Sequence, residues 1–375
     1  MAKTLPSGHT YEEIDGEELE YMKSKNVDYS EGGIKMQPGD YYVPKTFLKY
    51  AERNYNFEIK PTDIFLSSFP KTGMNWIQEI VWHLVHNPNL DNPDADISID
   101  IRCPFLDLDY RFLADGSLEF DPEGPFLKRF QELCPGIDYR DGIFYHMSRN
   151  TPEPRLIKHH TPYIYLNPDI LEKAKMIFMA RDPRDVITSN YHHASHHAVW
   201  AKMTTLENLV EDYITGKVFR PYWEHLRLNW EKRYHPNFHF VFYEDLKENP
   251  KIEIRKIDQF LGTKRTDEQI DNIVNCTSFS YMKKKWKHNP PTSFDNIFIK
   301  TDGEDKSITF FRKGKLSQRV YRKTRKNTGI YFSLFVAEKV GSWKEDLPLN
   351  IQDKIHAWMK ENLKQFGDDF KYKVE

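Results

Sequence analysis

The feature that most constrains the fold is an apolar run that passes through a glycine-containing turn into an amphipathic segment. Residues 63–69 are typical of a buried strand, and the Pro-Lys-Thr-Gly turn at residues 70–73 ends the run. The next segment, residues 75–86, has helical spacing of its apolar positions. These positions are Trp76, Ile77, Ile80, Val81 and Leu84. The pattern predicts a strand, a tight turn and a helix in direct succession.

The same order of elements recurs along the chain. Residues 175–180 predict a second strand and residues 185–197 the helix after it. A third strand is predicted at residues 238–243, with a helix over 251–261 that Gly262 ends. Alternating strands and helices favour a single α/β domain whose central parallel β-sheet is flanked by helices. Ligands of such sheets bind beyond the carboxyl ends of the strands.

Charge, cysteines and hydropathy limit the class of protein. The 54 basic and 56 acidic residues give a net charge of −2, so we expect neither a nucleic-acid nor a membrane partner, and any anion site must be local. Three scattered cysteines favour a reducing, cytoplasmic compartment over a disulfide framework. The polar N-terminus lacks a signal sequence, and no apolar run is long enough to span a bilayer.

Two segments differ in character from the predicted strands and helices. Residues 1–40 are polar, and we expect a loosely held leader there, followed by a short amphipathic helix over residues 41–50. Residues 104–154 mix glycine, proline and aromatic residues in a long irregular stretch. Loops of this length are usually functional or disordered, and the aromatic content argues against full disorder.

The turn at residues 70–73 has the chemistry of an anion site. Free N–H groups and the dipole of the following helix favour negative charge, and Lys71 adds a full positive charge there. Thr72 and Asn75 add polar side chains. The nucleotide-binding pattern G-x-x-x-x-G-K-[ST] is absent. On spacing alone, an ordinary helix start with a solvated lysine is an equally good interpretation.

Two further basic turns could hold a second anion. Arg181 directly follows a predicted strand, and Ser189 lies two helical turns further on; alternatively, Arg181 forms a surface salt bridge with Asp185. The Arg312-Lys313-Gly314 turn follows an aromatic pair, and its glycine would let the backbone approach a ligand closely. A solvated basic loop is the alternative for that turn.

Six segments, in order along the chain, resemble the motifs of the cytosolic sulfotransferase family. They are residues 69–76 (FPKTGMNW), 155–162 (RLIKHHTP), 180–192 (ARDPRDVITSNYH), 242–250 (FYEDLKENP), 277–283 (TSFSYMK) and 310–314 (FFRKG). A shorter match follows at residues 341–344. Each match is moderate evidence, and together they are highly specific. The resemblance implies a sulfotransferase domain over residues 41–375.

The resemblance implies transfer of a sulfonate group from 3′-phosphoadenosine-5′-phosphosulfate (PAPS) to the hydroxyl of a small apolar acceptor, such as a phenol or sterol. No metal is required, and the setting would be small-molecule metabolism or detoxification. The implied 5′-phosphosulfate site comprises Lys71, Thr72, Gly73, Met74, Asn75 and Trp76, with Trp76 facing the adenine. The implied 3′-phosphate site comprises Arg181, Ser189, Phe311, Arg312, Lys313 and Gly314. The implied adenosine lining comprises Tyr243, Thr277, Ser278 and Phe279.

The same resemblance assigns the catalytic roles. His160 would be the general base, because an imidazole titrates near neutral pH and can accept the hydroxyl proton. Lys71 would neutralise the leaving phosphate, and Lys158 would contact the sulfonate oxygens. Without the family context, a packed or surface histidine is the better interpretation of His160. The histidines at 192, 193, 196 and 197 have the spacing of zinc pairs, but we favour acceptor contact for one or two of them.

The sequence departs from the family at two places near the implied site. Met74 replaces a serine or threonine, so we expect weaker cofactor binding. The stretch 104–154 is roughly 25 residues longer than in mammalian members, within the regime of long functional loops. It resembles arthropod members, including an insect retinol dehydratase, and predicts a lid over the acceptor pocket. Dehydration of an allylic alcohol at the same site, and nucleotide or apolar-ligand binding without turnover, stay open as alternatives.

The C-terminal part departs further. The family pattern R-K-G-x-x-G-D-W-K is interrupted, because residues 315–340 separate Gly314 from Gly341. Removing residues 316–339 restores a close match, so the segment is a retained intron, a gene-model error or a genuine basic loop. The family's dimer motif is poorly matched at residues 344–353, so we expect a monomer or a weak homodimer.

Overall fold

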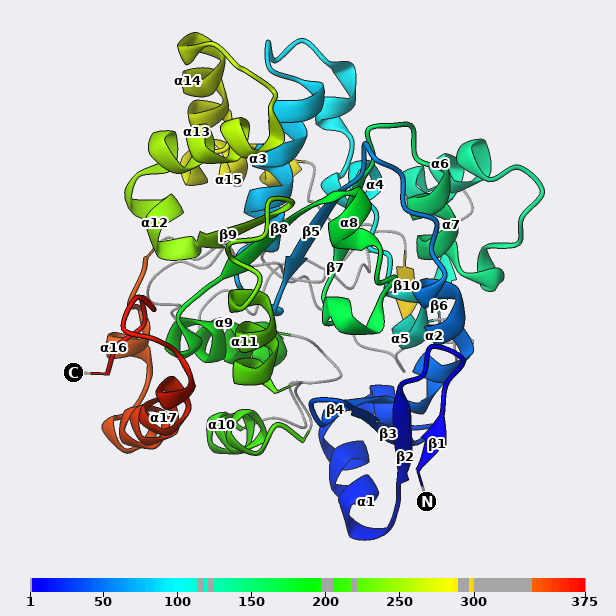
Figure 1. Ribbon diagram of the computed structural model, residues 1–375, viewed down its shortest axis with the longest axis vertical. Coiled ribbons are helices and arrows are strands. Elements are labelled where there is room, and N and C mark those ends of the chain that lie inside the picture. The colour runs from blue at the N-terminus through cyan, green and yellow to red at the C-terminus, as the bar shows by residue number, and fades with distance from the viewer. Residues whose placement is uncertain are drawn as a thin grey trace, which may run out of the picture.

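The computed structural model describes residues 2–112, 118–120, 124–196, 205–217, 221–288, 297–299 and 339–374. A four-stranded parallel sheet of order β7-β5-β8-β9 forms its centre (Figure 1). The strands are β5 (Ile64–Ser68), β7 (Leu156–His159), β8 (Lys175–Ala180) and β9 (Phe238–Phe242). This arrangement confirms the predicted α/β class and the three predicted strands, and it adds β7.

Helices follow the central strands in the order that the sequence predicts. The first group is α3 (Met74–His86), α8 (Ile170–Lys173), α9 (Pro183–His196), α10 (Leu206–Thr215) and α11 (Tyr222–Trp230). The second group is α12 (Tyr243–Glu248), α13 (Pro250–Leu261), α14 (Asp267–Cys276), α15 (Phe279–His288), α16 (Trp343–Asp346) and α17 (Leu349–Asn362). Gly262 ends α13 with a φ of 75°, as predicted.

The two faces of the sheet are covered by different helices. Phe65 packs in a cluster with residues of α9, α10, α11 and α17, whereas Ile64 and Leu66 pack with residues of α3, α13 and α14. Figure 1 shows α3, α13 and α14 on one side of the sheet and α9 and α11 on the other. Because successive side chains of a strand point to opposite faces, a continuous apolar run such as β5 is buried on both sides.

The N-terminal segment is ordered, in contrast to the loosely held leader that its polarity suggests. It forms an antiparallel sheet of β1 (Lys3–Thr4), β2 (Thr10–Ile14), β3 (Gly33–Gln37) and β4 (Tyr41–Pro44), with α1 (Gly16–Lys25) beside it. Ile34 and Met36 alternate along β3 and are buried against Tyr41 and Val43. A helix does follow, but only after β4, as the 3₁₀ turn η2 (Lys45–Phe47) and α2 (Leu48–Tyr55).

The long stretch 104–154 contains regular structure rather than an irregular loop. Its elements, with the preceding helix α4 (Ile99–Arg102), are α5 (Asp109–Phe112), β6 (Leu118–Phe120), α6 (Pro125–Leu133) and α7 (Ile143–Asn150). Phe126, Phe130 and Phe144 belong to a separate apolar cluster, which gives the stretch a small core of its own. Its strand β6 pairs antiparallel with β10 (Ile297–Ile299). Residues 300–338 lie outside the described part of the chain.

Within the described ranges, no helix combines the length and the apolar character that a bilayer crossing requires.

Candidate active site

The four central strands bring the predicted site segments to one edge of the sheet. Because the strands are parallel, the carboxyl ends of β5, β7, β8 and β9 lie side by side, with Ser67 opposite His159 and Ala180 opposite Phe242. The residues that follow these ends include Lys71, His160 and Arg181. Segments more than a hundred residues apart in the sequence therefore meet in one place.

The turn between β5 and α3 has the backbone shape of an anion cradle. Lys71 and Gly73 both have positive φ, at 73° and 101°. The N–H groups of Trp76 and Ile77 donate to the Gly73 carbonyl, so the preceding amides form the open N-terminus of the helix. The Thr72 hydroxyl donates to the Phe69 carbonyl at 2.9 Å and fixes the start of the turn. Such a terminus favours bound anions.

Arg181 places unsatisfied donors beside that turn. Its side chain is 1% exposed, its Nη1 donates to the Lys71 carbonyl at 3.3 Å, and its guanidinium lies 4.5 Å from the Tyr243 ring centroid. Nη2 is 3.8 Å from Asp185 Oδ2. Neither Nε nor Nη2 makes a hydrogen bond with any described residue, and the same is true of the buried Ser189 hydroxyl. Burying hydrogen-bond donors of this kind costs free energy unless an acceptor binds to them.

Positive charge also lies beside the turn between β5 and α3, and it affects the pKa of Lys71. Burial, reinforced by the charges of Arg181 and Lys158, lowers the pKa of Lys71 to about 7. Lys71 is therefore close to two other cationic side chains, Arg181 and Lys158. A bound phosphate or sulfate would add negative charge there and raise the pKa of Lys71.

His160 points its ring back to the end of β5. Its Nδ1 lies 2.7 Å from the Ser68 carbonyl oxygen, and its ring meets Phe105 edge-to-face at 4.9 Å. A carbonyl oxygen only accepts, so Nδ1 carries the proton and Nε2 of the neutral ring keeps its lone pair. This tautomer leaves Nε2 able to accept a proton from a hydroxyl group.

Lys158, two residues before His160, is held inside the protein. Its Nζ lies 3.4 Å from Asp100 Oδ1 and 4.5 Å from the Phe105 ring centroid. Lys158 and Asp100 are both nearly inaccessible to solvent. The ammonium is therefore anchored near the cradle by a buried ion pair.

The predicted adenosine-binding residues are partly gathered at the site. Trp76 and Tyr243 meet edge-to-face at 5.5 Å, and both belong to the core cluster of α3 and α14. Thr277 and Ser278 end α14 and donate their hydroxyls to Ile273 and Asn275 carbonyls, each at 2.7 Å. Phe279, at the start of α15, packs against the same cluster. Residues 311–314 of the predicted 3′-phosphate site lie outside the described residues.

Of the four histidines shortly after Ser189, the structure describes the side chains of His192 and His193. His193 is buried, and His192 Nε2 lies 3.9 Å from Asp346 Oδ2. His197 lies outside the described residues. Across the described ranges, no three His, Cys, Asp or Glu side chains are grouped as a metal site would require.

Sequence reasoning missed three residues that support the site. Ser68 offers its carbonyl to His160, Asp100 pairs with Lys158, and Asp107 accepts from the backbone of the His160 segment. One sequence signal could have indicated the aspartates: Asp100, Asp107 and Asp109 lie in a stretch whose other residues, apart from Arg102, are apolar or aromatic, and all three are buried. Acidic residues are rarely buried unless they are paired.

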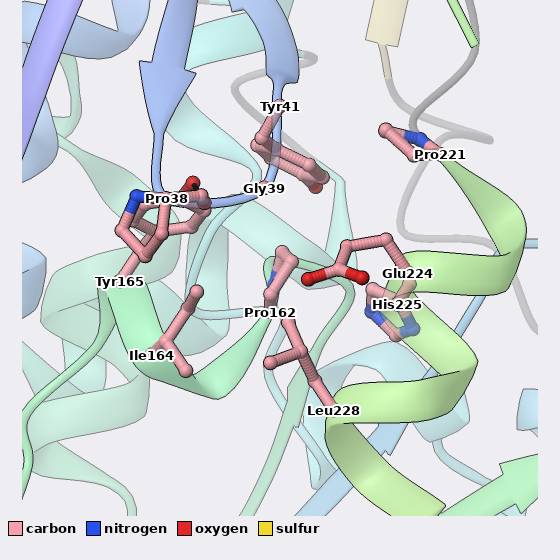
Figure 2. Close-up of a pocket in the computed structure, with 10 residues that line it drawn as sticks. All are labelled: Pro38, Gly39, Tyr41, Pro162, Ile164, Tyr165, Pro221, Glu224, His225 and Leu228. Atoms are coloured by element: carbon pink, nitrogen blue, oxygen red, sulfur yellow. Dashed lines mark hydrogen bonds between the residues drawn. The ribbon is translucent and has the colours of Figure 1, made fainter. Parts of the chain in front are cut away.

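A small pocket adjoins the segment that carries His160. Figure 2 shows it between the β3–β4 turn, the 3₁₀ turn η5 (Tyr163–Tyr165) and α11, with room for about one water molecule. Pro162 lies in its wall, two residues after His160. The one carboxylate in the lining belongs to Glu224, which binds Arg227 at 2.7 and 2.9 Å. The pocket therefore offers mainly apolar surface.

Comparison with known protein sequences identifies one domain family. Residues 61–328 match the family model described as Sulfotransferase domain. Sulfotransferase 1A1 of Mus musculus is 34% identical over 276 residues, which cover 72% of this chain and 82% of that protein. Sulfotransferase 1E1 of Bos taurus is 25% identical over 361 residues, covering 94% of this chain and 100% of that protein.

Comparison with solved structures gives the same result for the fold. Retinol dehydratase in complex with androsterone and the inactive cofactor PAP has a TM-score of 0.70 and 25% identity, covering 99% of each chain. Retinol dehydratase with retinol and PAP has a TM-score of 0.71 and 24% identity, covering 99% of this chain and 100% of that one. The similarity extends over the N-terminal sheet and the stretch 104–154.

Proposed function

The chain belongs to the sulfotransferase family and transfers sulfonate groups to small hydroxyl acceptors, and we propose that its donor is PAPS and its acceptor a small apolar alcohol or phenol. One observation carries this proposal. Arg181, which donates to the Lys71 carbonyl in the turn before α3, and Ser189, two helical turns further along α9, hold buried donors that lack hydrogen-bond partners among the described residues. A sulfonate donor that carries two phosphate groups could accept hydrogen bonds both from these side chains and from the amides at the start of α3.

The residues divide the work of sulfonate transfer. When bound, PAPS supplies the activated sulfonate and a phosphate leaving group. His160 Nε2 accepts the proton of the acceptor hydroxyl, since Nδ1 is committed to Ser68. Lys71 and the amides after it stabilise negative charge on the departing phosphate, and Lys158 contacts the sulfonate oxygens.

One alternative rests on a specific observation. The similarity to retinol dehydratase includes the additional helices α5, α6 and α7 and reaches 25% identity over nearly the whole chain. Dehydration of an allylic alcohol would use the same donor and the same base: the alcohol forms a transient sulfate ester, which then loses sulfate and a proton to give the alkene. The two reactions differ only in the fate of the ester.

Product analysis with labelled PAPS tests the proposal. The purified protein is incubated with ³⁵S-labelled PAPS and phenols, sterols or retinol, and the products are separated. We expect a labelled sulfate ester of at least one acceptor and formation of PAP. A dehydrated product would favour the alternative. Tight PAP binding without turnover of any acceptor would contradict both and would favour a binding protein.

Uptake of a proton on cofactor binding is expected from the electrostatics of Lys71. Its pKa of about 7, lowered from 10.5, leaves most of the side chain neutral at about pH 8 in the unliganded protein. A bound phosphate raises this pKa, so PAP binding should take up close to one proton. Calorimetry of PAP binding in two buffers of different ionisation enthalpy measures the uptake. The Lys71→Met variant should show none, and equal heats for the wild type would contradict the assignment.

The same shift has a consequence for stability without ligand. Between about pH 7 and pH 10 the unfolded chain binds a proton at Lys71 that the folded chain does not. The contribution of Lys71 therefore makes the free energy of unfolding rise with pH across this window. PAP should reduce that rise, because it restores the proton to the folded state.

Replacing Gly73 by alanine is expected to weaken PAP binding by at least about tenfold, the equivalent of one lost charge-assisted hydrogen bond. A Cβ at this position would lie 2.7 Å and 2.8 Å from two carbons of the Tyr243 ring, and φ is 101°. The turn or the ring must then move. Titration with PAP measures the loss. Gly136→Ala is the control, because a Cβ at Gly136 meets no atom within 4 Å although φ is 78°. Unchanged affinity in Gly73→Ala would contradict the role of the turn.

A further inference from the structure

We propose that Asp107 is a positioning residue that holds His160 in its reactive orientation. The inference rests on the proposed function, because it concerns the proposed general base. Asp107 lies in the stretch before α5, and its side chain is 2% exposed. No part of the family resemblance assigned it a role, and it has no direct contact with the phosphate cradle among the contacts described.

The chain brings Asp107 to His160 through backbone pairing. Phe105 forms a parallel bridge with Lys158 at the edge of β7. The Lys158 N–H donates to the Pro104 carbonyl, and the Leu106 N–H donates to the Lys158 carbonyl, each at 2.9 Å. Residues 104–106 therefore run beside the end of β7 as an added edge. Asp107 follows directly and reaches the level of His160.

The Asp107 carboxylate binds two successive backbone amides. The His160 N–H lies 3.1 Å from Oδ2 and 3.2 Å from Oδ1, and the Thr161 N–H lies 2.5 Å from Oδ2. Both amides lie just beyond the last residue of β7, where strand pairing ends. Hydrogen bonds to an ionised carboxylate are stronger and shorter than neutral ones. The carboxylate thus fixes the backbone that carries the imidazole.

The position of this backbone decides whether the ring can work as a base. The Nδ1–Ser68 bond of 2.7 Å sets the tautomer, and it forms only if the Cα of His160 is correctly placed relative to β5. Catalytic groups must be held to within about 0.5 Å, and a displacement of about 1 Å can cost about 100-fold in rate. Weakening the hydrogen bonds between the Asp107 carboxylate and the His160 and Thr161 amides should therefore lower the rate of the chemical step.

A purely structural role for Asp107 is the competing explanation, and Asp109 provides the matched control. Asp109 accepts from the N–H groups of Phe144 and Tyr145, each at 3.0 Å, and pairs with Arg53 at 3.1 Å. It is buried to the same degree as Asp107. Its two amides begin α7 and have no bond to His160. The Asp109→Asn change therefore weakens a comparable pair of carboxylate–amide hydrogen bonds, but in α7 and not next to His160.

The experiment compares Asp107→Asn, Asp107→Glu and Asp109→Asn in the full-length protein. An asparagine keeps one accepting oxygen but places an amide donor against backbone N–H groups. We expect Asp107→Asn to lower kcat by about 10- to 100-fold while the Kd for PAP changes by less than about twofold. Asp107→Glu should restore at least part of kcat. Asp109→Asn should keep kcat within about threefold of wild type, whatever its effect on Tm.

A second measurement does not depend on turnover. The ¹⁵N shifts of labelled histidine, with the His160 signal assigned by its loss in His160→Ala, report which ring nitrogen carries the proton. In the PAP complex, wild type and Asp109→Asn should both show the Nδ1–H form. Asp107→Asn should shift toward a mixture of tautomers, because its ring no longer stays on Ser68.

The outcomes separate this inference from the proposed function. Wild-type kcat together with an unchanged His160 tautomer in Asp107→Asn would overturn the positioning role and leave sulfonate transfer untouched. No turnover by the wild type would count against the proposed function, while the tautomer would still decide the positioning role. If Asp107→Asn does not fold, Asp107→Ser, which also removes the carboxylate, decides through the same tautomer: a shift toward a mixture supports the inference, and an undisturbed Nδ1–H form overturns it.

Discussion

Replacing His160 by alanine is expected to lower kcat for sulfonate transfer by about 10²- to 10⁴-fold, the range supplied by a general base. The variant removes Nε2, the ring nitrogen that carries the lone pair when Nδ1 donates to the Ser68 carbonyl. The Kd for PAP should stay near the wild-type value, because the phosphate cradle belongs to other segments. Initial rates with labelled PAPS and a calorimetric titration with PAP measure the two quantities.

The control for this variant is His235→Ala. His235 precedes β9 at the opposite edge of the sheet, where its Nδ1 accepts the Asn237 N–H at 3.2 Å. It should keep wild-type turnover. Turnover by His160→Ala close to the wild-type rate would remove His160 from the mechanism.

Replacing Arg181 by methionine is expected to raise the Kd for PAP by about 100-fold or more, since hydrogen bonds to charged groups contribute about 1.5–3 kcal/mol each. The Tm of the unliganded protein should not fall by more than a few degrees, because a buried cation with two unsatisfied nitrogens is itself unfavourable. Asp185 keeps its bond from the Gly341 N–H at 2.8 Å in the variant. Thermal unfolding with and without PAP measures both effects.

Arg184→Met is the matched control for this change. Arg184 lies three residues further on, binds Asp182 with two nitrogens and stacks on Trp343 at 4.4 Å. Its loss should lower Tm and leave the affinity for PAP near the wild-type value. A tight PAP complex of Arg181→Met would contradict the assignment of the 3′-phosphate site.

The central sheet could be predicted from the sequence because its strands are buried on both faces. Such strands are short, continuous apolar runs, as at residues 64–68 and 175–180, and each is followed by a turn and a helix. The fourth strand, β7, was missed because half of its residues are Lys158 and His159. This strand is stabilised by its pairing with β5, and the local sequence pattern does not predict pairing with a distant strand.

The N-terminal sheet and the helices of residues 104–154 could not be predicted from local composition. Polar outward positions outnumber the buried ones along β2, where only Ile14 is buried. The helix α6 has a buried face made by Phe126, Leu127 and Phe130, but it starts directly at a proline within a glycine- and proline-containing region. In both cases the segment is held in place by an apolar cluster whose members come from separate parts of the sequence.

The motifs in the sequence pointed to side chains that the structure brings close together, and their roles stay predictions. Lys71 and Arg181 follow predicted strands, whereas His160 follows β7, which only its motif pointed to; all three lie at one edge of the sheet. Ser68 and Asp107 were not predicted, because they act on His160 through backbone atoms across 92 and 53 residues. No spacing rule in the sequence records such contacts.

A crystal structure of the complex with PAP and an acceptor tests the central claim most directly. The account predicts the 5′-phosphate on Lys71 and the first amides of α3, the 3′-phosphate on Arg181 and Ser189, and the acceptor hydroxyl within hydrogen-bond reach of His160 Nε2. A nucleotide bound away from the β5–α3 turn, or an imidazole turned away from the acceptor, would contradict it.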